Sequence, residues 1–434
     1  MLHALGKKLR RFKPQSASFR NVLKLAGGTA GSQVITVAAA PILTRLYGPE
    51  SFGVLATFAS ILALLNVVSS LRYELAIAVP EDDDEAIALV WLCFVLVAIS
   101  TALTALGVAL LGNQLVGFLH QQALKPLLWL LPVGVLLTGI YQPLSYWAIR
   151  HKQFGLLAQT KFHQSIFGLL TKLSAAPLGT IGLLLGQIVS QSAGVTSIFI
   201  ESREALLGGP KTPSVFLLQV LQRYKNLGIY SSPAGMINML GSQVPTLIFA
   251  SAFGAGDLGK LAIAQSLLVL PVGLIGSSVS KVFLGQASSH WRLGTLDKYI
   301  KKAGTYLIVA GILVALFMSL VVAPIAPIIL GIQWESLRII IPMLSPLLIG
   351  QLTASTLSMA FIVAENNRLE LMSQLLQAIL RLSCLGLSVF AGVSFSFSVL
   401  AFSVGSLLGY TCYALLLFNS LKNQQNKFMQ QLKE

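Results

Sequence analysis

The sequence predicts an all-α polytopic membrane protein with about twelve transmembrane helices in two six-helix lobes. Three observations support this class. The chain is 55% hydrophobic and only 10% charged, whereas an ordinary soluble domain is roughly 25% charged. Apolar runs of helix length recur from residue 22 to residue 421, and about 20 such residues cross a bilayer. Lys and Arg residues are concentrated in alternate loops between these runs.

The spans follow from the apolar runs, taken in chain order. In the first half they lie near residues 22–44, 52–72, 86–111, 124–148, 157–178 and 183–204. In the second half they lie near residues 227–253, 259–283, 303–329, 338–363, 370–390 and 396–420. The first run is expected to be a membrane helix and not a signal peptide. The reason is that Pro41 directly follows the small residues that resemble a cleavage site.

The distribution of Lys and Arg sets the orientation of these spans. With the N-terminus inside, 24 of the 30 Lys and Arg residues lie in inner segments. Such a bias toward the inner side is typical of membrane proteins, so both termini are expected to be cytoplasmic. The formal charge of +15 is then spread over one membrane face. There it would attract anionic membrane lipids, and nucleic acid is not expected as a partner.

An internal repeat predicts how the two halves are related. The segment "GSQV" occurs at 31–34 and again at 241–244, and "YGPESFGVLA" (47–56) matches "FGAGDLGKLA" (253–262). Six spans separate the two copies, so both halves enter the membrane from the same side. This pattern indicates a parallel repeat, which is typical of transporters; chance similarity between apolar helices is the alternative. The expected segments are a basic cytoplasmic N-terminus (1–21), a first lobe (22–204), a cytoplasmic linker (205–226), a second lobe (227–420) and a cytoplasmic tail (421–434).

A guanidinium in the middle of an apolar span raises the question of what surrounds it. Arg381 lies about halfway along the span 370–390, where burying a charge costs at least about 2.5–3.5 kcal/mol. On a helix it shares one polar face with Gln374 and Gln377. Two interpretations are open. Arg381 either hydrogen-bonds to neighbouring groups at a helix contact, or forms the cationic wall of a hydrated cavity.

The fifth and first spans also carry polar faces. Lys161 and Lys172 fall on the same side of the predicted fifth helix. Lys172 either extends to the outer surface or lines a cavity. The first span carries a stripe of small and polar residues: Thr29, Gln33, Thr36, Ala40 and Thr44. Such a stripe is typical of close helix packing, and lining a pathway is the alternative.

The acidic residues discriminate between kinds of cargo. All fifteen Asp and Glu residues lie in loops or within a turn or two of a predicted helix end, and none lies at mid-membrane. A carrier of organic cations is expected to place a carboxylate there as counter-charge. Basic side chains without an acidic one indicate an anionic cargo. No catalytic motif, metal-ligand spacing or cofactor motif occurs, so the chain is not expected to be an enzyme.

Two segments resemble a known family. They are "PILTRLYGPESFGVLATFASIL" (41–62) and "LRYELAIAVPEDDDEA" (71–86), and the likeness is close over roughly 40–110. Both are similar to the polysaccharide-flippase branch, often called Wzx-type, of the multidrug/oligosaccharidyl-lipid/polysaccharide exporter superfamily. The resemblance implies two six-helix lobes, a central cavity and alternating access. It also makes Arg72, in "LRYE", a candidate for the cavity; an interfacial anchor at the end of the second span is the alternative.

The resemblance further implies a cargo, a polyprenyl-pyrophosphate-linked oligosaccharide that crosses a bacterial inner membrane. The expected function is therefore that of a flippase in which Arg381, Lys172 and Arg72 neutralise the pyrophosphate. A surface polysaccharide or O-antigen repeat unit is the expected glycan. Glycan polymerases or glycosyltransferases of the same pathway are expected partners.

Two rival functions are weighed against this one. The first is a multidrug or organic-cation exporter of the same fold, which the missing intramembrane carboxylate disfavours. The second is a membrane-embedded glycan polymerase or transferase. The absence of a large outer loop and of a catalytic constellation disfavours that class.

Overall fold

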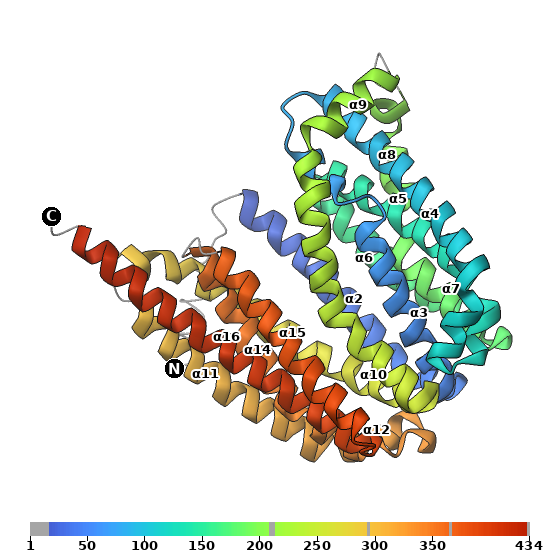
Figure 1. Ribbon diagram of the computed structural model, residues 1–434, viewed down its shortest axis with the longest axis vertical. Coiled ribbons are helices and arrows are strands. Elements are labelled where there is room, and N and C mark those ends of the chain that lie inside the picture. The colour runs from blue at the N-terminus through green and yellow to red at the C-terminus, as the bar shows by residue number, and fades with distance from the viewer. Residues whose placement is uncertain (1–16, 208–212, 293–295, 364–366, 432–434) are drawn as a thin grey trace, which may run out of the picture.

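The computed structural model describes residues 17–207, 213–292, 296–363 and 367–431, and this part of the chain is almost entirely helical. The helices of the first half are α2 (Ala17–Leu46), α3 (Pro49–Val68), α4 (Asp83–Leu119), α5 (Leu130–Arg150), α6 (Phe154–Ser174), α7 (Thr180–Ser192), α8 (Val195–Leu207) and α9 (Pro213–Arg223). Those of the second half are α10 (Ser232–Arg292), α11 (Leu296–Phe317), α12 (Ala323–Leu330), α13 (Leu337–Met343), α14 (Ser345–Val363), α15 (Asn367–Phe390) and α16 (Phe395–Gln431). Figure 1 shows two groups of helices inclined to each other, one with α3 to α8 and one with α11 and α14 to α16. The long helix α10 packs against both groups, mainly through α3 and α14.

The predicted spans all fall on helical segments, but several of them are broken. The sixth span is divided into α7 and α8, and the break lies beside Gly194, whose φ is 99°. The seventh and eighth spans are joined in α10, which is interrupted at Gly254, where φ is 76°. The tenth span is bent by 53° between α13 and α14. The interruption at Gly254 falls between the predicted seventh and eighth spans, whereas the breaks at Gly194 and between α13 and α14 fall inside predicted spans.

The number of helices that could cross a membrane in the structure differs from the number of spans that the sequence predicts. Among the described residues, seven helical stretches are long and apolar enough to cross a membrane, or eight if the bent pair counts as one span. Helices α2, α5 and α6 lie outside that set, and the interrupted α10 counts once in it. For α6 the reason is its polar face, because polar side chains lower the mean hydropathy of a helix. The fold is therefore that of a multi-span helical membrane protein, and the number twelve remains a prediction.

The two halves meet where glycines let their backbones approach. A Cβ atom on Gly53 of α3 would lie 1.7 Å from the carbonyl oxygen of Ala255 in α10. A Cβ atom on Gly259 of α10 would lie 1.8 Å from the carbonyl oxygen of Pro49 in α3. In the predicted repeat Gly53 corresponds to Gly259 and Pro49 to Ala255, so the contact is reciprocal. A two-fold relation between the halves would produce such a contact, and the repeat itself remains a prediction.

A second link between the halves lies at the C-terminal end of α2. The carbonyl oxygen of Thr44 accepts hydrogen bonds from Gln333 Nε2 at 2.5 Å and from Trp334 Nε1 at 3.1 Å. The Thr44 hydroxyl donates to the carbonyl oxygen of Leu330 at 3.0 Å. Trp334 and Thr44 are fully buried. These bonds tie the halves together at the end that the Lys/Arg pattern assigns to the outer face.

Two hydrophobic clusters hold the helices together. The larger one extends through both halves, with Phe58 of α3, Phe249 of α10 and Leu348 of α14 among its buried members. The smaller one lies within the first half, where the 3₁₀ segment η1 (Tyr73–Ala78) packs against α4 and α5. Because the larger core is shared, the two halves are held together by van der Waals packing of apolar side chains as well as by the bonds of Thr44.

Candidate functional site

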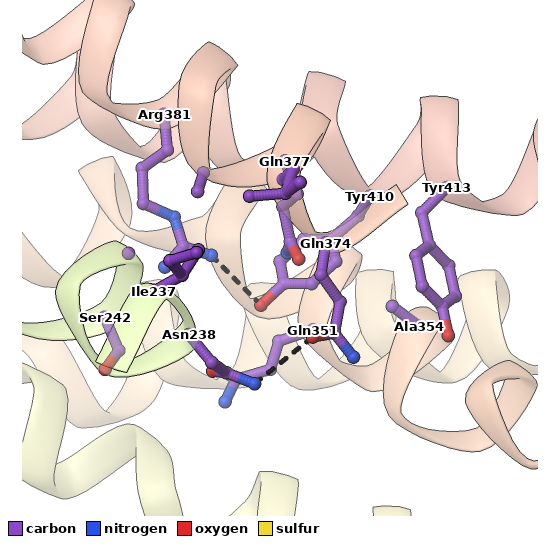
Figure 2. A pocket seen from close by; sticks show the side chains of 13 residues that line it. Ile237, Asn238, Ser242, Gln351, Ala354, Gln374, Gln377, Arg381, Tyr410 and Tyr413 are labelled. Atoms are coloured by element: carbon purple, nitrogen blue, oxygen red, sulfur yellow. Dashed lines mark hydrogen bonds between the residues drawn. The ribbon is translucent and has the colours of Figure 1, made fainter. Parts of the chain in front are cut away.

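Two polar cavities lie among the helices, and each is lined by residues from one half of the chain. The first, which we call the α15 cavity, has a volume of about 350 Å³ and is walled by α10, α14, α15 and α16. Figure 2 shows its side chains converging from these helices. A smaller cavity of about 230 Å³ adjoins it and shares Ser242, Gln351, Arg381 and Tyr410 with it.

Arg381 lies in the wall between the α15 cavity and its smaller neighbour. Its guanidinium donates to the Tyr410 hydroxyl at 3.4 Å, as Figure 2 shows. The guanidinium carbon also lies 5.7 Å from the ring centroid of Phe402 and 5.9 Å from that of Tyr410. Contacts of this kind contribute about 0.5–2 kcal/mol each. The two interpretations of Arg381 therefore combine, because it makes a helix contact and lines a cavity.

The α15 cavity contains predicted residues and others that the sequence does not single out. Gln374 and Gln377, predicted to share a face with Arg381, both line it. Asn238 of α10 donates to Gln374 Oε1 at 3.2 Å, a bond that Figure 2 also shows. Five polar lining residues come from other helices and were missed by the sequence analysis: Asn238, Ser242, Gln351, Tyr410 and Tyr413. Their only sequence signal is that each is a polar side chain within an apolar span.

The second cavity, which we call the α6 cavity, has a volume of about 300 Å³ and is walled by α2, α6 and α7. The polar stripes of the first and fifth predicted spans meet here. Gln33 and Thr36 line it from α2, and Lys161 and Lys172 line it from α6. The helices approach closely because Gly28 packs against Ala158, where a Cβ atom would lie 2.9 Å from the carbonyl oxygen. Of the predicted stripe on α2, Thr29, Gln33 and Thr36 line this cavity, and Thr44 is buried against the second half.

The two lysines of the α6 cavity are held by glutamines. Lys161 Nζ donates to Gln164 Oε1 at 3.2 Å, and Lys172 Nζ donates to Gln187 Oε1 at 3.5 Å. The stem of Lys172 packs so closely on Gly186 that a Cβ atom there would lie 2.2 Å from Lys172 Cγ. The ammonium of Lys172 therefore faces the cavity, and this geometry supports the cavity interpretation over extension to the surface.

Arg72 is placed apart from both cavities. It occupies a break after α3, where Leu71 and Arg72 have φ values of 49° and 64°. The chain then continues along α4 as η1, and the carbonyl oxygen of Ser69 accepts a bond from Ser100, near the middle of α4. Arg72 therefore follows the second apolar helical stretch, which ends at Val68, and its role as an interfacial anchor stays a prediction. Its guanidinium packs against Gly235 of α10. A Cβ atom added to Gly235 would lie 3.5 Å from the guanidinium carbon of Arg72.

Close to this break lies Glu74, a buried acidic residue. Its side chain belongs to η1, inside the first half, and only 3% of the residue is exposed. It accepts a hydrogen bond of 2.5 Å from the Ser70 hydroxyl. Glu74 follows the end of α3 at Val68, as predicted for an acidic residue near a helix end, but the sequence pattern does not reveal its burial. Glu74 lines neither of the two polar cavities.

The electrostatic character of both cavities is positive. Their linings contain Arg381, Lys161 and Lys172 and no Asp or Glu. Within the described ranges, no group of three or more His, Cys, Asp or Glu side chains could hold a metal ion. The arrangement provides hydrogen-bond donors and positive charge inside the membrane part of the protein. It is therefore suited to binding polar, anionic molecules.

Comparison with known families gives one match. Residues 42–339 match the family described as "Polysaccharide biosynthesis protein". No curated protein sequence matches the chain.

Comparison with solved structures shows the fold. The lipid II flippase MurJ in an inward closed conformation has a TM-score of 0.66 and 16% identity, over 94% of this chain and 92% of that chain. A mutant of the MATE transporter VcmN from Vibrio cholerae has a TM-score of 0.58 and 14% identity, over 94% of this chain and 96% of that chain. A transporter of the MOP superfamily from Pyrococcus furiosus has a TM-score of 0.60 and 13% identity, over 94% of this chain and 95% of that chain. At these identities the likeness concerns the fold alone.

Proposed function

The chain belongs to the polysaccharide biosynthesis protein family, and from this membership and its cavities we infer that it is a lipid-linked oligosaccharide flippase. We propose that it moves a polyprenyl-pyrophosphate-linked oligosaccharide, the repeat unit of a surface polysaccharide or O-antigen. The movement is from the inner to the outer leaflet of a bacterial inner membrane. Both termini are cytoplasmic in this proposal, in keeping with the distribution of Lys and Arg.

The observation that carries the proposal is the charge of the two cavities. Arg381, Lys161 and Lys172 line them, and no carboxylate does. The cargo of such a flippase carries a diphosphate between its lipid and its glycan. Hydrogen bonds from ammonium or guanidinium groups to phosphate oxygens are roughly twice as strong as those between neutral groups. Positive cavities within membrane helices therefore favour this cargo over a cationic one.

Alternating access is the proposed mechanism, and the structure supports it with a closed end. The bonds of Thr44 with Gln333 and Trp334 join the halves at the predicted outer face. Breaking them would let that end open. The diphosphate and sugars would then cross in hydrated cavities while the polyprenyl chain stays in the bilayer. This route avoids the transfer of a bare charge into hydrocarbon, which costs tens of kcal/mol in an idealised medium.

The alternative is an exporter of drugs or organic cations, and one observation favours it. Glu74 is buried, and among the described residues it makes no ion pair. A buried carboxylate in a membrane transporter is a candidate counter-charge for a cation. Glu74 lies outside both cavities, however, so it does not provide a counter-charge to a molecule bound in either of them. The flippase is therefore the better supported function.

The test uses a strain that lacks the gene, complemented with the wild type, Arg381→Ala or Lys172→Ala. An impermeant probe reports which leaflet holds the lipid-linked glycan. We expect the glycan to accumulate in the inner leaflet without the gene, and each variant to restore its transfer poorly at normal expression. Arg203→Ala is the control, because Arg203 is an exposed cation of α8 outside both cavities.

Two other outcomes are informative. If the leaflet distribution never changes, the flippase proposal is wrong, and sensitivity of the strain to cationic drugs becomes the next measurement. If the deletion traps the glycan but Arg381→Ala restores transfer fully, the flippase proposal stands. Arg381 is then only a residue of helix packing.

A further inference from the structure

We infer that the two cavities divide the cargo between them: the α15 cavity binds the glycan, and the α6 cavity binds the diphosphate. This inference rests on the proposed function, because it concerns the parts of a lipid-linked oligosaccharide. It goes beyond that function by assigning a different chemical group to each half of the molecule.

The lining of the α15 cavity fits carbohydrate. Amide side chains reach it from three helices: Asn238 from α10, Gln351 from α14, and Gln374 and Gln377 from α15. A carboxamide offers both donors and an acceptor, and a sugar hydroxyl also donates and accepts, so amides match hydroxyls well. The cavity adjoining it adds a further amide, that of Gln265. Amides therefore outnumber the single guanidinium, and recognition here is mainly by hydrogen bonds to neutral groups.

Two tyrosines complete this lining. Tyr410 and Tyr413 reach the α15 cavity from α16, and Figure 2 shows both beside the amides. A tyrosine offers an apolar ring face together with a polar hydroxyl. A sugar ring also has an apolar face of C–H groups and a rim of hydroxyls. The combination of amides and tyrosines therefore matches both kinds of surface on one ligand.

The lining of the α6 cavity differs in the ways that matter for phosphate. It contains two ammonium groups, those of Lys161 and Lys172, and no aromatic side chain. An ammonium is a compact point charge that binds phosphate oxygens from any direction. The remaining polar groups are hydroxyls and the amides of Gln33, Gln164 and Gln187. The last two already accept bonds from the lysines, so they hold the charges in place.

The volumes of the cavities agree with this division. The α15 cavity and its neighbour have volumes of about 350 and 230 Å³, and the α6 cavity has about 300 Å³. Small-molecule sites usually occupy about 300–1,000 Å³. The α15 cavity and its neighbour, which share lining residues, together offer more space than the α6 cavity. The glycan is the larger polar part of the cargo, since it carries several sugars.

The test measures the binding of two separate probes to the purified full-length protein in lipid nanodiscs. One probe is inorganic pyrophosphate. The other is the free oligosaccharide, released by mild acid from the lipid-linked glycan that accumulates in the deletion strain. Gln351→Leu and Tyr413→Phe test the α15 cavity, and Lys172→Gln tests the α6 cavity. Gln219→Leu is the matched control, because Gln219 is an exposed residue of α9 outside both cavities.

We expect Gln351→Leu and Tyr413→Phe to weaken oligosaccharide binding about 3–10-fold each, which is the effect of one neutral hydrogen bond. Pyrophosphate binding should stay unchanged in both variants.

Lys172→Gln should weaken pyrophosphate binding about 10-fold or more, since the bond lost is to a charged group. It should leave oligosaccharide binding unchanged. Melting temperatures within a few degrees of the wild type confirm that the variants fold, and Tyr413→Phe removes a single oxygen atom.

The inference is overturned if the variants of both cavities weaken both probes equally, or if oligosaccharide binding follows Lys172 and not Gln351. It is also overturned if the wild type binds pyrophosphate but not the oligosaccharide. In these cases the proposed function stands, because the deletion strain has supplied a trapped lipid-linked glycan. If no such glycan accumulates, the proposed function fails, and the division of the cargo fails with it.

Discussion

Arg381 and Lys172 are both cations inside membrane helices, and the structure holds them in different ways. Arg381 lies near the rings of Phe402 and Tyr410 and donates to the Tyr410 hydroxyl. Lys172 packs its stem on Gly186 and directs its ammonium to Gln187. A planar guanidinium suits stacking on rings, whereas an ammonium suits a point contact. The two residues are therefore not interchangeable in their sites.

A substitution that keeps the charge tests this difference at Arg381. Arg381→Lys keeps the positive charge but loses the planar group that faces two rings. We expect transport of the lipid-linked glycan to fall about 10-fold, because about 1–2 kcal/mol of cation–π energy is lost. The measurement is the rate of glycan transfer in the complemented deletion strain. Tyr410→Phe should have a smaller effect, since it removes only a bond of 3.4 Å. Wild-type transport by Arg381→Lys would show that only the charge matters.

At the scale of helices, the contact between α3 and α10 depends on residues without side chains. Gly53 and Gly259 bring each helix onto a backbone carbonyl of the other. Close approach of helices at small residues is a common way to associate helices in lipid, where the hydrophobic effect does not drive them together. The contact links helices from both halves. It is therefore a candidate pivot for the movement that alternating access requires.

A methyl group at this contact is expected to destabilise the protein. The Cβ atom of Gly53→Ala would lie 1.7 Å from a carbonyl oxygen of α10, so the two backbones must separate. We expect a loss of about 1–3 kcal/mol in stability, seen as a lower melting temperature of the purified protein. Gly107→Ala is the control, because nothing lies within 4 Å of its Cβ position in α4. It should be neutral or stabilising by up to about 1 kcal/mol. Equal melting temperatures for the two variants would contradict the close contact.

At the scale of the whole molecule, the halves are joined at one end by Trp334. Its indole N–H donates to the carbonyl oxygen of Thr44 at 3.1 Å, across the boundary between the halves. Trp91 makes a bond of similar length, 3.2 Å, to the carbonyl oxygen of Leu206, but this bond lies within the first half. Trp334 and Trp91 therefore allow the same indole-to-carbonyl hydrogen bond to be compared between the halves and within one half. Only the first should affect the opening of the outer end.

The comparison uses a reporter cysteine at Thr36, which lines the α6 cavity, in a background without Cys93, Cys384 and Cys412. Trp334→Phe removes the bond across the boundary, so we expect an impermeant thiol reagent to label the reporter faster from outside. A net loss of about 0.5–1.5 kcal/mol per hydrogen bond corresponds to a rate about 2–10 times higher. Trp91→Phe should leave the rate unchanged. Equal rates in both variants would show that the Trp334 bond does not hold the outer end closed.

The sequence by itself determined the class of the protein, the approximate positions of its helices, and the polar faces of α2, α6 and α15. Hydropathy and helical periodicity are local properties, so they show where a helix runs and which of its residues share a face. Gln374, Gln377 and Arg381 could be grouped in this way because they lie on one helix.

Only the tertiary structure decided which faces meet. It brought the stripes of α2 and α6 together in one cavity, and it added Asn238, Gln351, Tyr410 and Tyr413 to Arg381. It also placed Arg72 at a break after α3 and buried Glu74 near it. These placements depend on contacts between helices far apart in the chain. The spacing of residues along one helix carries no information about such contacts, so they appear only once the helices are packed.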